Sequence, residues 1–169
     1  MDVKILQAAT EEHLDQIRSL MLAFVEWHKQ RHTADLALID QYFNKKAFDA
    51  ELATLPGKYA PLKGRLLLAL EKDEPAGCVG LHAIDARICE MKRMFVYPQF
   101  HGRGIGRALA ETLIREAKSI GYDCIRLDTG PKQVEAQDLY RNLGFKEIQP
   151  YYDLPEELRE WLLFMELKL

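Results

Sequence analysis

Three glycines alternate with other residues in the middle of the chain, at Gly102, Gly104 and Gly106. Glycine has no Cβ atom, so it turns tightly and lets a ligand come close to the main chain. An amphipathic segment starts near Gly104, and the first N–H groups of a helix there would have no partner within the helix. Those groups and the helix dipole favour an anion, so the loop is predicted to hold a phosphate-bearing ligand. Donor side chains stand beside it at His101, Arg103 and Arg107.

Other classes of phosphate-binding loop are also rich in glycine. A Walker loop needs Lys and then Ser or Thr after its last glycine, but Arg107 and Ala108 stand there. A dinucleotide-binding fingerprint needs Gly-x-Gly-x-x-Gly, which this spacing does not match. Asp128 does lie about 20 residues downstream, as that fingerprint requires, but too little chain follows for a doubly wound domain. A strand–turn–helix corner without a ligand stays open as an alternative.

Three motifs follow one another in the second half of the chain. Gln99–Gly104 reads Gln-x-x-Gly-x-Gly, Glu90–Pro98 precedes it as an extended segment, and Ala136–Phe145 reads Ala-x-x-Leu-Tyr-x-x-x-Gly-Phe. In order and spacing they resemble the cofactor loop, the fourth strand with its bulge, and the tyrosine element of the GCN5-related N-acetyltransferase (GNAT) superfamily. Three motifs together are more specific than any one alone. The resemblance extends from about Cys78 to Ile148.

The resemblance implies a single α/β (α+β) domain over residues 1–169 that uses acetyl-coenzyme A (acetyl-CoA). The expected sheet is mixed and mostly antiparallel, with about six or seven strands and about four flanking helices, and splays between its fourth and fifth strands. The pantetheine arm would lie in that gap against the main chain of Met94 and Val96, with the phosphates on the amides of His101 to Arg107. The cofactor-binding residues expected from the resemblance are Met94, Phe95, Val96, Gln99, His101, Gly102, Arg103, Gly104, Ile105, Gly106, Arg107, Gln133 and Tyr140.

Two residues are expected to act in the chemistry. Tyr140 matches the family tyrosine that reaches the sulfur, and its phenol, with an ordinary pKa of about 10, can donate a proton to the departing thiolate. An aromatic ring packed on a helix face is the alternative for Tyr140. Glu90 stands where the family often has a carboxylate that accepts the proton of the amine directly or through water. For Glu90 the alternative is a structural ion pair with Lys92 or Arg93.

The leading hypothesis is direct transfer of the acetyl group to a small-molecule amine within a ternary complex. A protein or peptide N-acetyltransferase is the second choice within the enzyme class, and a non-catalytic acyl-CoA binding or sensing domain is the alternative outside it. None of the three cysteines falls in the matched loop or tyrosine motifs, which argues against an acyl-cysteine intermediate. A homodimer is expected only by analogy, because dimers are common in the family.

Composition restricts the remaining functions. The net charge of −3 argues against sequence-independent binding of nucleic acid, which needs a basic face. No apolar run approaches the roughly 20 residues of a membrane span, and the first residues lack the pattern of a signal peptide. Cys78, Cys89 and Cys124 are scattered and odd in number, which predicts reduced thiols in a cytoplasmic protein and no metal site.

Hydrophobic periodicity predicts the elements that position these residues. Helices are expected over about 10–25, 34–55, 104–120 and 134–142, and strands over about 3–8, 64–71, 76–84, 88–96, 124–129, 145–149 and 162–167. Within 88–96, simple alternation places Cys89, Met91 and Phe95 on one face together with Arg93. The same alternation places Glu90, Lys92, Met94 and Val96 on the other face.

Aromatic side chains from both ends of the chain are candidates for an acceptor pocket. One or two of a set of five aromatic residues are expected to line it: Trp27, Tyr42, Phe43, Tyr151 and Tyr152. His28 and His32 are four residues apart, a spacing that can hold a metal on a helix. No further ligand accompanies them, so the expectation is a solvated helix face.

Overall fold

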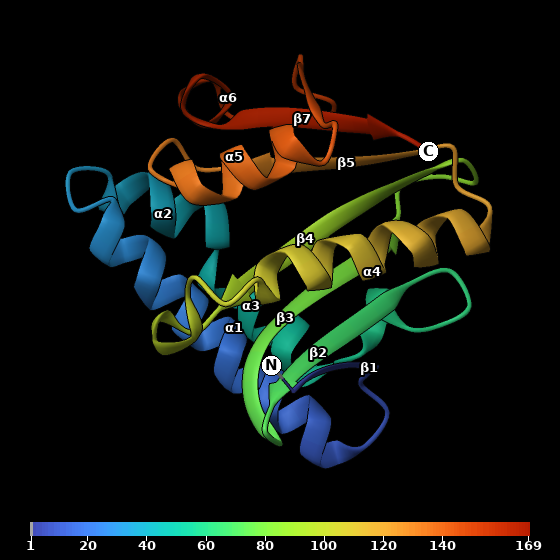
Figure 1. Cartoon of the computed structure of the whole chain (residues 1–169). Helices are drawn as coiled ribbons and strands as arrows, with labels where there is room; N and C mark the ends of the chain where they lie inside the picture. Colours follow the sequence, from blue (N-terminus) through green and yellow to red (C-terminus); the bar gives the residue numbers. More distant parts are fainter. Residues whose placement is uncertain (1) are drawn as a thin grey trace.

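An open seven-stranded sheet organises the chain in the computed structural model, which describes residues 2–169 (Figure 1). The strands are β1 (Val3–Gln7), β2 (Arg65–Glu71), β3 (Glu74–Ala83), β4 (Ile88–Val96), β5 (Cys124–Thr129), β6 (Lys146–Ile148) and β7 (Leu163–Lys168). The helices are α1 (Glu11–Arg31), α2 (Leu36–Phe43), α3 (Lys45–Ala53), α4 (Ile105–Ile120), α5 (Val134–Asn142) and α6 (Glu156–Trp161), with short 3-10 turns η1 (Gly57–Tyr59) and η2 (Pro98–Phe100).

The strand order β1-β2-β3-β4-β5-β7-β6 brings β4 beside β5 in the middle of the sheet. All neighbouring pairs are antiparallel except β4 and β5, which run parallel. That pairing extends only from Ile88–Glu90 on β4 to Cys124–Arg126 on β5. Beyond it the two strands separate, as Figure 1 shows above α4. The prediction of a mixed sheet that splays between its fourth and fifth strands is confirmed.

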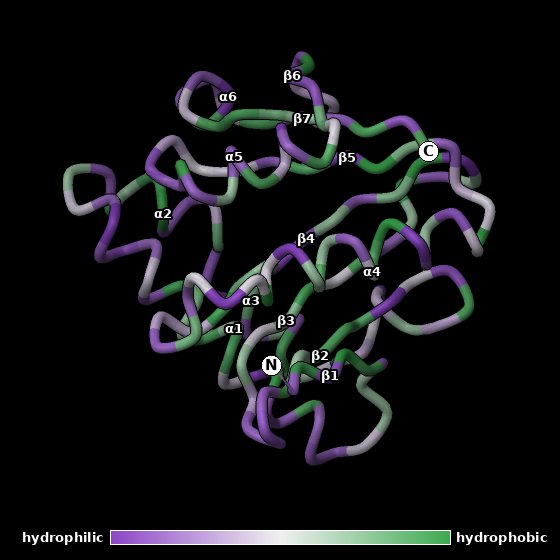
Figure 2. Tube along the Cα trace, in the orientation of Figure 1, coloured by the Kyte–Doolittle hydropathy of each residue, from purple (hydrophilic) through white to green (hydrophobic). Residues whose placement is uncertain are grey.

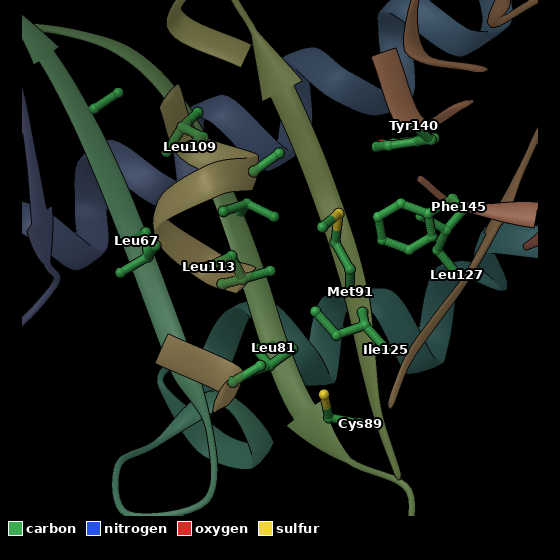
Figure 3. Packing of buried hydrophobic residues seen from close by; sticks show 14 of the residues in the cluster. Leu67, Leu81, Cys89, Met91, Leu109, Leu113, Ile125, Leu127, Tyr140 and Phe145 are labelled. Carbon is green, nitrogen blue, oxygen red and sulfur yellow. The ribbon is translucent and has the colours of Figure 1, made fainter. Parts of the chain in front are cut away.

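Two hydrophobic clusters lie on opposite faces of the sheet. Leu67 and Ala69 of β2 pack into the cluster under α4, together with Leu109 and Leu113 (Figure 3). Leu66 and Leu68, which alternate with them, belong to the second cluster, with the apolar residues of α1, α2 and α3. A strand that buries both faces reads as a continuous apolar run, and β2 is correspondingly green along most of its length in Figure 2.

Residues 2–169 form six α-helices, two more than predicted. The helical region expected over 34–55 breaks at Asn44, whose φ of +32° ends α2. The same residue caps α3, because its side-chain oxygen accepts a hydrogen bond from the Ala47 N–H at 3.1 Å. The second extra helix, α6, forms between the strands expected over 145–149 and 162–167, where no helix was predicted, and buries Leu158. None of these helices is long and apolar enough to cross a bilayer.

A bulge in β4 changes which side chains face which layer. Lys92 pairs with Gly80, but Phe95 pairs with Cys78, so β4 has one residue more than β3 across this interval. The extra residue lies at Arg93, whose φ is +60°. Beyond the bulge the alternation is reversed, and Phe95 packs in the cluster with α1 while Met94 packs in the cluster with α4. The simple alternation predicted for 88–96 is therefore wrong after Lys92.

Candidate active site

Two cavities meet where β4 and β5 separate. The larger, here called the loop groove, has a volume of about 410 Å³ and runs along the glycine loop and the start of α5. The smaller, here called the central cavity, has about 50 Å³ and lies among β4, β5, α1 and α5. A common wall separates them, formed by Phe24, Met94, Gln133 and Ala136. A ligand bound in the loop groove would therefore end beside the central cavity.

The glycine loop leaves main-chain donors open at the start of α4. Gly102 and Gly104 both have φ of +76°, and a Cβ atom at either would have no atom of the described chain within 4 Å. The first amide of α4 to bond back along the chain is Ala108 N–H, which donates to the Gly104 carbonyl at 3.0 Å. Within residues 2–169 no side chain caps this helix. The amides of residues 105–107 are therefore available to an anion.

The cationic side chains of the loop have carboxylate partners. Arg103 donates to Glu71 at 2.9 Å, and Arg107 donates to Glu111 at 3.1 Å. The ring of His101 donates from Nε2 to the Val96 carbonyl at 2.9 Å. Because these groups are occupied within the protein, the main chain is the principal anion donor of the loop.

Nine of the residues predicted to bind the cofactor line the loop groove. They are Met94, Phe95, Val96, His101, Gly102, Gly104, Ile105, Gly106 and Gln133. Gln99, Arg103 and Arg107 lie in or beside the loop but do not line the groove, and Tyr140 lines the central cavity instead. Which of them contact a ligand stays a prediction.

Tyr140 projects from α5 toward the gap between the strands, above Met91 and Leu127 (Figure 3). The residue is buried, and its ring packs against Phe145 with 5.6 Å between the ring centres. Its hydroxyl makes no hydrogen bond to another side chain within residues 2–169. Burial, and then the charge of Asp128, raises the pKa of Tyr140. The phenol is therefore protonated at neutral pH and free to donate into the cavity.

Glu90 lies outside both cavities, within a network of its own. Its carboxylate accepts hydrogen bonds from His82 Nε2 at 2.8 Å and from the Tyr151 hydroxyl, and Lys92 Nζ lies 3.6 Å away. Burial would raise the pKa of Glu90, but His82, Lys92 and Tyr151 together lower it to about 2. The ion pair with Lys92 that was the alternative for Glu90 is present. Its part as a base stays a prediction.

A carboxylate that the sequence did not single out for catalysis lies inside the central cavity. Asp128 of β5 accepts hydrogen bonds from the Tyr42 hydroxyl at 2.5 Å and from the Tyr152 hydroxyl at 2.6 Å. Burial, and then the charge of Asp128, raises the pKa of both tyrosines, so they remain donors. The usable signal was an acidic residue in an apolar strand, just beyond the expected splay. Tyr42, one of the five aromatic residues named as candidates for the acceptor pocket, lines this cavity, and its part in acceptor binding stays a prediction.

His28 of α1 and His32, which caps the end of that helix, are buried, so the prediction of a solvated helix face is wrong. The connection between β5 and α5 folds over them, and their rings stack with 5.4 Å between centres. His32 Nδ1–H donates to the His28 carbonyl at 2.9 Å, and its Nε2 accepts from the Lys132 N–H at 3.2 Å. That pair of bonds requires a neutral His32. In residues 2–169, no three side chains of His, Cys, Asp or Glu gather as a metal site would need.

His28 connects α1 to the common wall of the two cavities. Its Nδ1 lies 3.4 Å from the Gln133 side-chain amide, and the ring lines the central cavity. Burial and the charges of His32, Arg93 and Arg31 lower the pKa of His28 to about 3. A neutral Nδ1 can accept the hydrogen bond of Gln133, so His28 helps to position that side chain.

Comparisons with known proteins agree with this geometry. The Acetyltransferase (GNAT) family matches residues 22–145. An uncharacterized N-acetyltransferase of Dictyostelium discoideum is 30% identical over 100% of both chains, and one of Schizosaccharomyces pombe is 38% identical over 63% of this chain and 67% of its own. Among solved structures, the PaiA N-acetyltransferase of Thermoplasma acidophilum in complex with coenzyme A has the same fold, with a TM-score of 0.73 at 18% identity over 100% of both chains.

Proposed function

The chain belongs to the Acetyltransferase (GNAT) family, and on that premise we propose that it transfers the acetyl group of acetyl-CoA to the amine of a small molecule. One observation carries the proposal. The loop groove, with its uncapped helix start, ends at a wall beyond which a phenol and a carboxylate face a second cavity. A groove for the donor therefore meets a cavity for the acceptor at groups that can move protons.

The loop groove suits the cofactor in shape and in donors. Acetyl-CoA, when bound, would supply the acetyl group as an activated thioester. The amides of residues 105–107 would hold its phosphates. The main chain near Met94 would hold its pantetheine arm, because Met94 has no partner in the β3–β4 register and lies beyond the β4–β5 pairing. The complex of the Thermoplasma protein with coenzyme A supports this use of the fold.

Asp128 and Tyr140 divide the proton transfers between them in this proposal. An amine with a pKa of about 10 must lose a proton before it attacks, and Asp128 lies in the cavity where the proton would be released. The Tyr140 hydroxyl, protonated and free of other partners in the described chain, donates the proton that the leaving thiolate requires. Glu90 remains a second candidate base, acting through water from outside the cavity. Direct transfer needs no acyl-enzyme nucleophile.

A thiol-release assay across a panel of amines and short peptides tests the function. We expect release of free thiol from acetyl-CoA with small amines, and a lower rate with Tyr140→Phe at unchanged affinity for the cofactor. Calorimetric binding of acetyl-CoA without release for any acceptor would instead indicate a binding or sensing domain. Release with peptides alone would indicate a protein acetyltransferase, and Tyr140→Phe at full rate would remove the proton-donor assignment.

A further inference from the structure

A third cavity, here called the basic pocket, adjoins the central cavity on the side of α2, α3 and η1. Its volume is about 440 Å³. Tyr42, Lys92 and Arg93 line both cavities, so the basic pocket continues the space in which the acceptor is proposed to bind. The assigned groups of the acetyl transfer do not use it.

Positive charge exceeds negative charge among the described residues that line the basic pocket. Lys58, Lys92 and Arg93 face one carboxylate, Glu51. Arg93 donates to Glu51 from Nε at 2.8 Å and from Nη2 at 3.3 Å, and Lys58 Nζ lies 3.4 Å from the same carboxylate. The one acid therefore already serves two cations.

Lys92 has the longest carboxylate contact of the three cations that line the basic pocket. Its side chain is only 16% exposed, and its nearest carboxylate oxygen is 3.6 Å away, in the ion pair with Glu90. An ammonium in a nearly enclosed site is stabilised by an anion that can reach it. Lys92 lies where the basic pocket and the central cavity meet.

Lys58 is also close enough to Lys92 and Arg93 for their charges to act on it. Burial lowers the pKa of Lys58, the Glu51 carboxylate raises it, and repulsion from Lys92 and Arg93 lowers it again, with a net lowering. A carboxylate partner normally raises the pKa of a lysine. An anionic ligand would relieve this repulsion.

Tyr42 joins this positive site to the carboxylate of the central cavity. Its hydroxyl donates to Asp128, and Lys92 Nζ lies 5.6 Å from the centre of its ring. Asp128 therefore lies at the hydroxyl end of Tyr42 and Lys92 lies over its ring, so one small ligand that carries both an ammonium and a carboxylate can contact the two side chains.

We propose that the acceptor is a small amine that carries a carboxylate, with the amine beside Asp128 and the carboxylate beside Lys92 in the basic pocket. This inference rests on the proposed acetyl transfer and names the class of its acceptor. A diamine would bring a second cation into a site that already holds three, and is disfavoured.

Matched acceptors test the inference in the thiol-release assay. Each L-amino acid is compared with its carboxamide and with its decarboxylated amine, and a diamine and phosphoethanolamine are added. We expect kcat/KM to be about tenfold or more higher for the amino acid, because a charge-assisted hydrogen bond contributes about 1.5–3 kcal/mol. The amine of the carboxamide has a lower pKa, so more of it is neutral and reactive at a given pH. A preference for the amino acid would therefore have to overcome this intrinsic advantage of the carboxamide. A preference for phosphoethanolamine would assign the pocket to phosphate and overturn the carboxylate.

Lys92→Gln should abolish the preference for the amino acid over its carboxamide. Lys118→Gln, which makes the same charge change on an exposed position of α4, should keep it. An unchanged preference in Lys92→Gln, or equal turnover of amino acids and carboxamides by the natural protein, would overturn the inference and leave the acetyl transfer intact.

If no amine is acetylated, binding measurements distinguish the proposed acceptor class from the proposed acetyl transfer. The melting temperature is measured with coenzyme A and each member of a pair. A rise with amino acids but not with carboxamides, lost in Lys92→Gln, supports the basic pocket even if thiol release fails for every acceptor and the proposed function falls. No rise with any carboxylate, together with no turnover, would overturn both.

Discussion

The two sides of the gap between β4 and β5 differ in whether main-chain groups or side chains form the site. The loop groove consists mainly of main chain, glycine and apolar side chains, and the arginines beside it, Arg103 and Arg107, are paired with carboxylates. The acceptor side consists of buried polar side chains that meet across long stretches of sequence, such as Tyr42 with Asp128 and Glu51 with Arg93. The groove thus recognises a ligand through groups that every residue has, while the acceptor side depends on particular side chains.

This difference predicts where substitutions matter. On the groove side, a change of side chain should matter only where it blocks the main chain. On the acceptor side, removal of a single oxygen or nitrogen should change rate, specificity or stability. Four experiments test that contrast, beginning with the one for which the largest effect is expected.

Asp128→Asn should lower kcat/KM by about 10²–10⁴-fold, because the amide can hold the tyrosine hydroxyls but cannot accept a proton. Steady-state thiol release measures the loss, and a melting curve checks the fold. Glu90→Gln is the matched control on the neighbouring strand, and its loss of rate should be much smaller. The reverse order of the two variants would return the base to Glu90.

Gly104→Val should weaken binding of coenzyme A by roughly a hundredfold. The new side chain would strain a residue with φ of +76° and obstruct amides that make two or three hydrogen bonds worth about 1–1.5 kcal/mol each. Gly121→Val is the control, because Gly121 ends the same helix with φ of +105° and also has no described atom within 4 Å of a Cβ. Both should lose about 1–2 kcal/mol of stability, but only Gly104→Val should lose affinity in calorimetry. Equal affinities would place the phosphates elsewhere.

The same contrast explains what the sequence could predict. The strands Ile88–Val96 and Cys124–Thr129 and the helix Val134–Asn142 have the predicted bounds, because local periodicity and glycines determine them. Asp128 could not be assigned, because its partners come from α2 and from the segment before α6. The burial of His28 likewise depends on the distant segment that covers it. The break at Asn44 was missed because a capping asparagine within a helical pattern resembles an interior residue.

His28 contacts the wall between the loop groove and the acceptor side, and low pH should destabilise the fold through this residue. Its folded pKa of about 3 lies below the ordinary value of 6.5, so its stabilisation is complete above pH 6.5 and is lost as pH falls toward 3. Each pH unit in that window removes up to about 1.4 kcal/mol from the free energy of unfolding. His28→Gln should therefore show a flatter dependence than the natural protein in urea titrations between pH 8 and 4. Parallel curves would mean that His28 is not held neutral by burial and by the charges of His32, Arg93 and Arg31.

Tyr59→Phe should have the smallest effect and the opposite sign. Tyr59 is fully buried at the wall of the basic pocket, and its hydroxyl has no hydrogen-bond partner among residues 2–169, although Glu51 lies nearby. Loss of an unpaired buried hydroxyl should raise the free energy of unfolding by about 1 kcal/mol, or the melting temperature by about 2–4 °C.

Tyr122→Phe is the matched control for Tyr59→Phe. The Tyr122 hydroxyl is held by the Lys63 carbonyl at 2.7 Å in the cluster under α4, so its removal should destabilise the protein by a similar amount. If both variants were destabilised alike, the Tyr59 hydroxyl would have a partner in solution. The buried hydroxyls on the two sides of the gap would then contribute to stability in the same way.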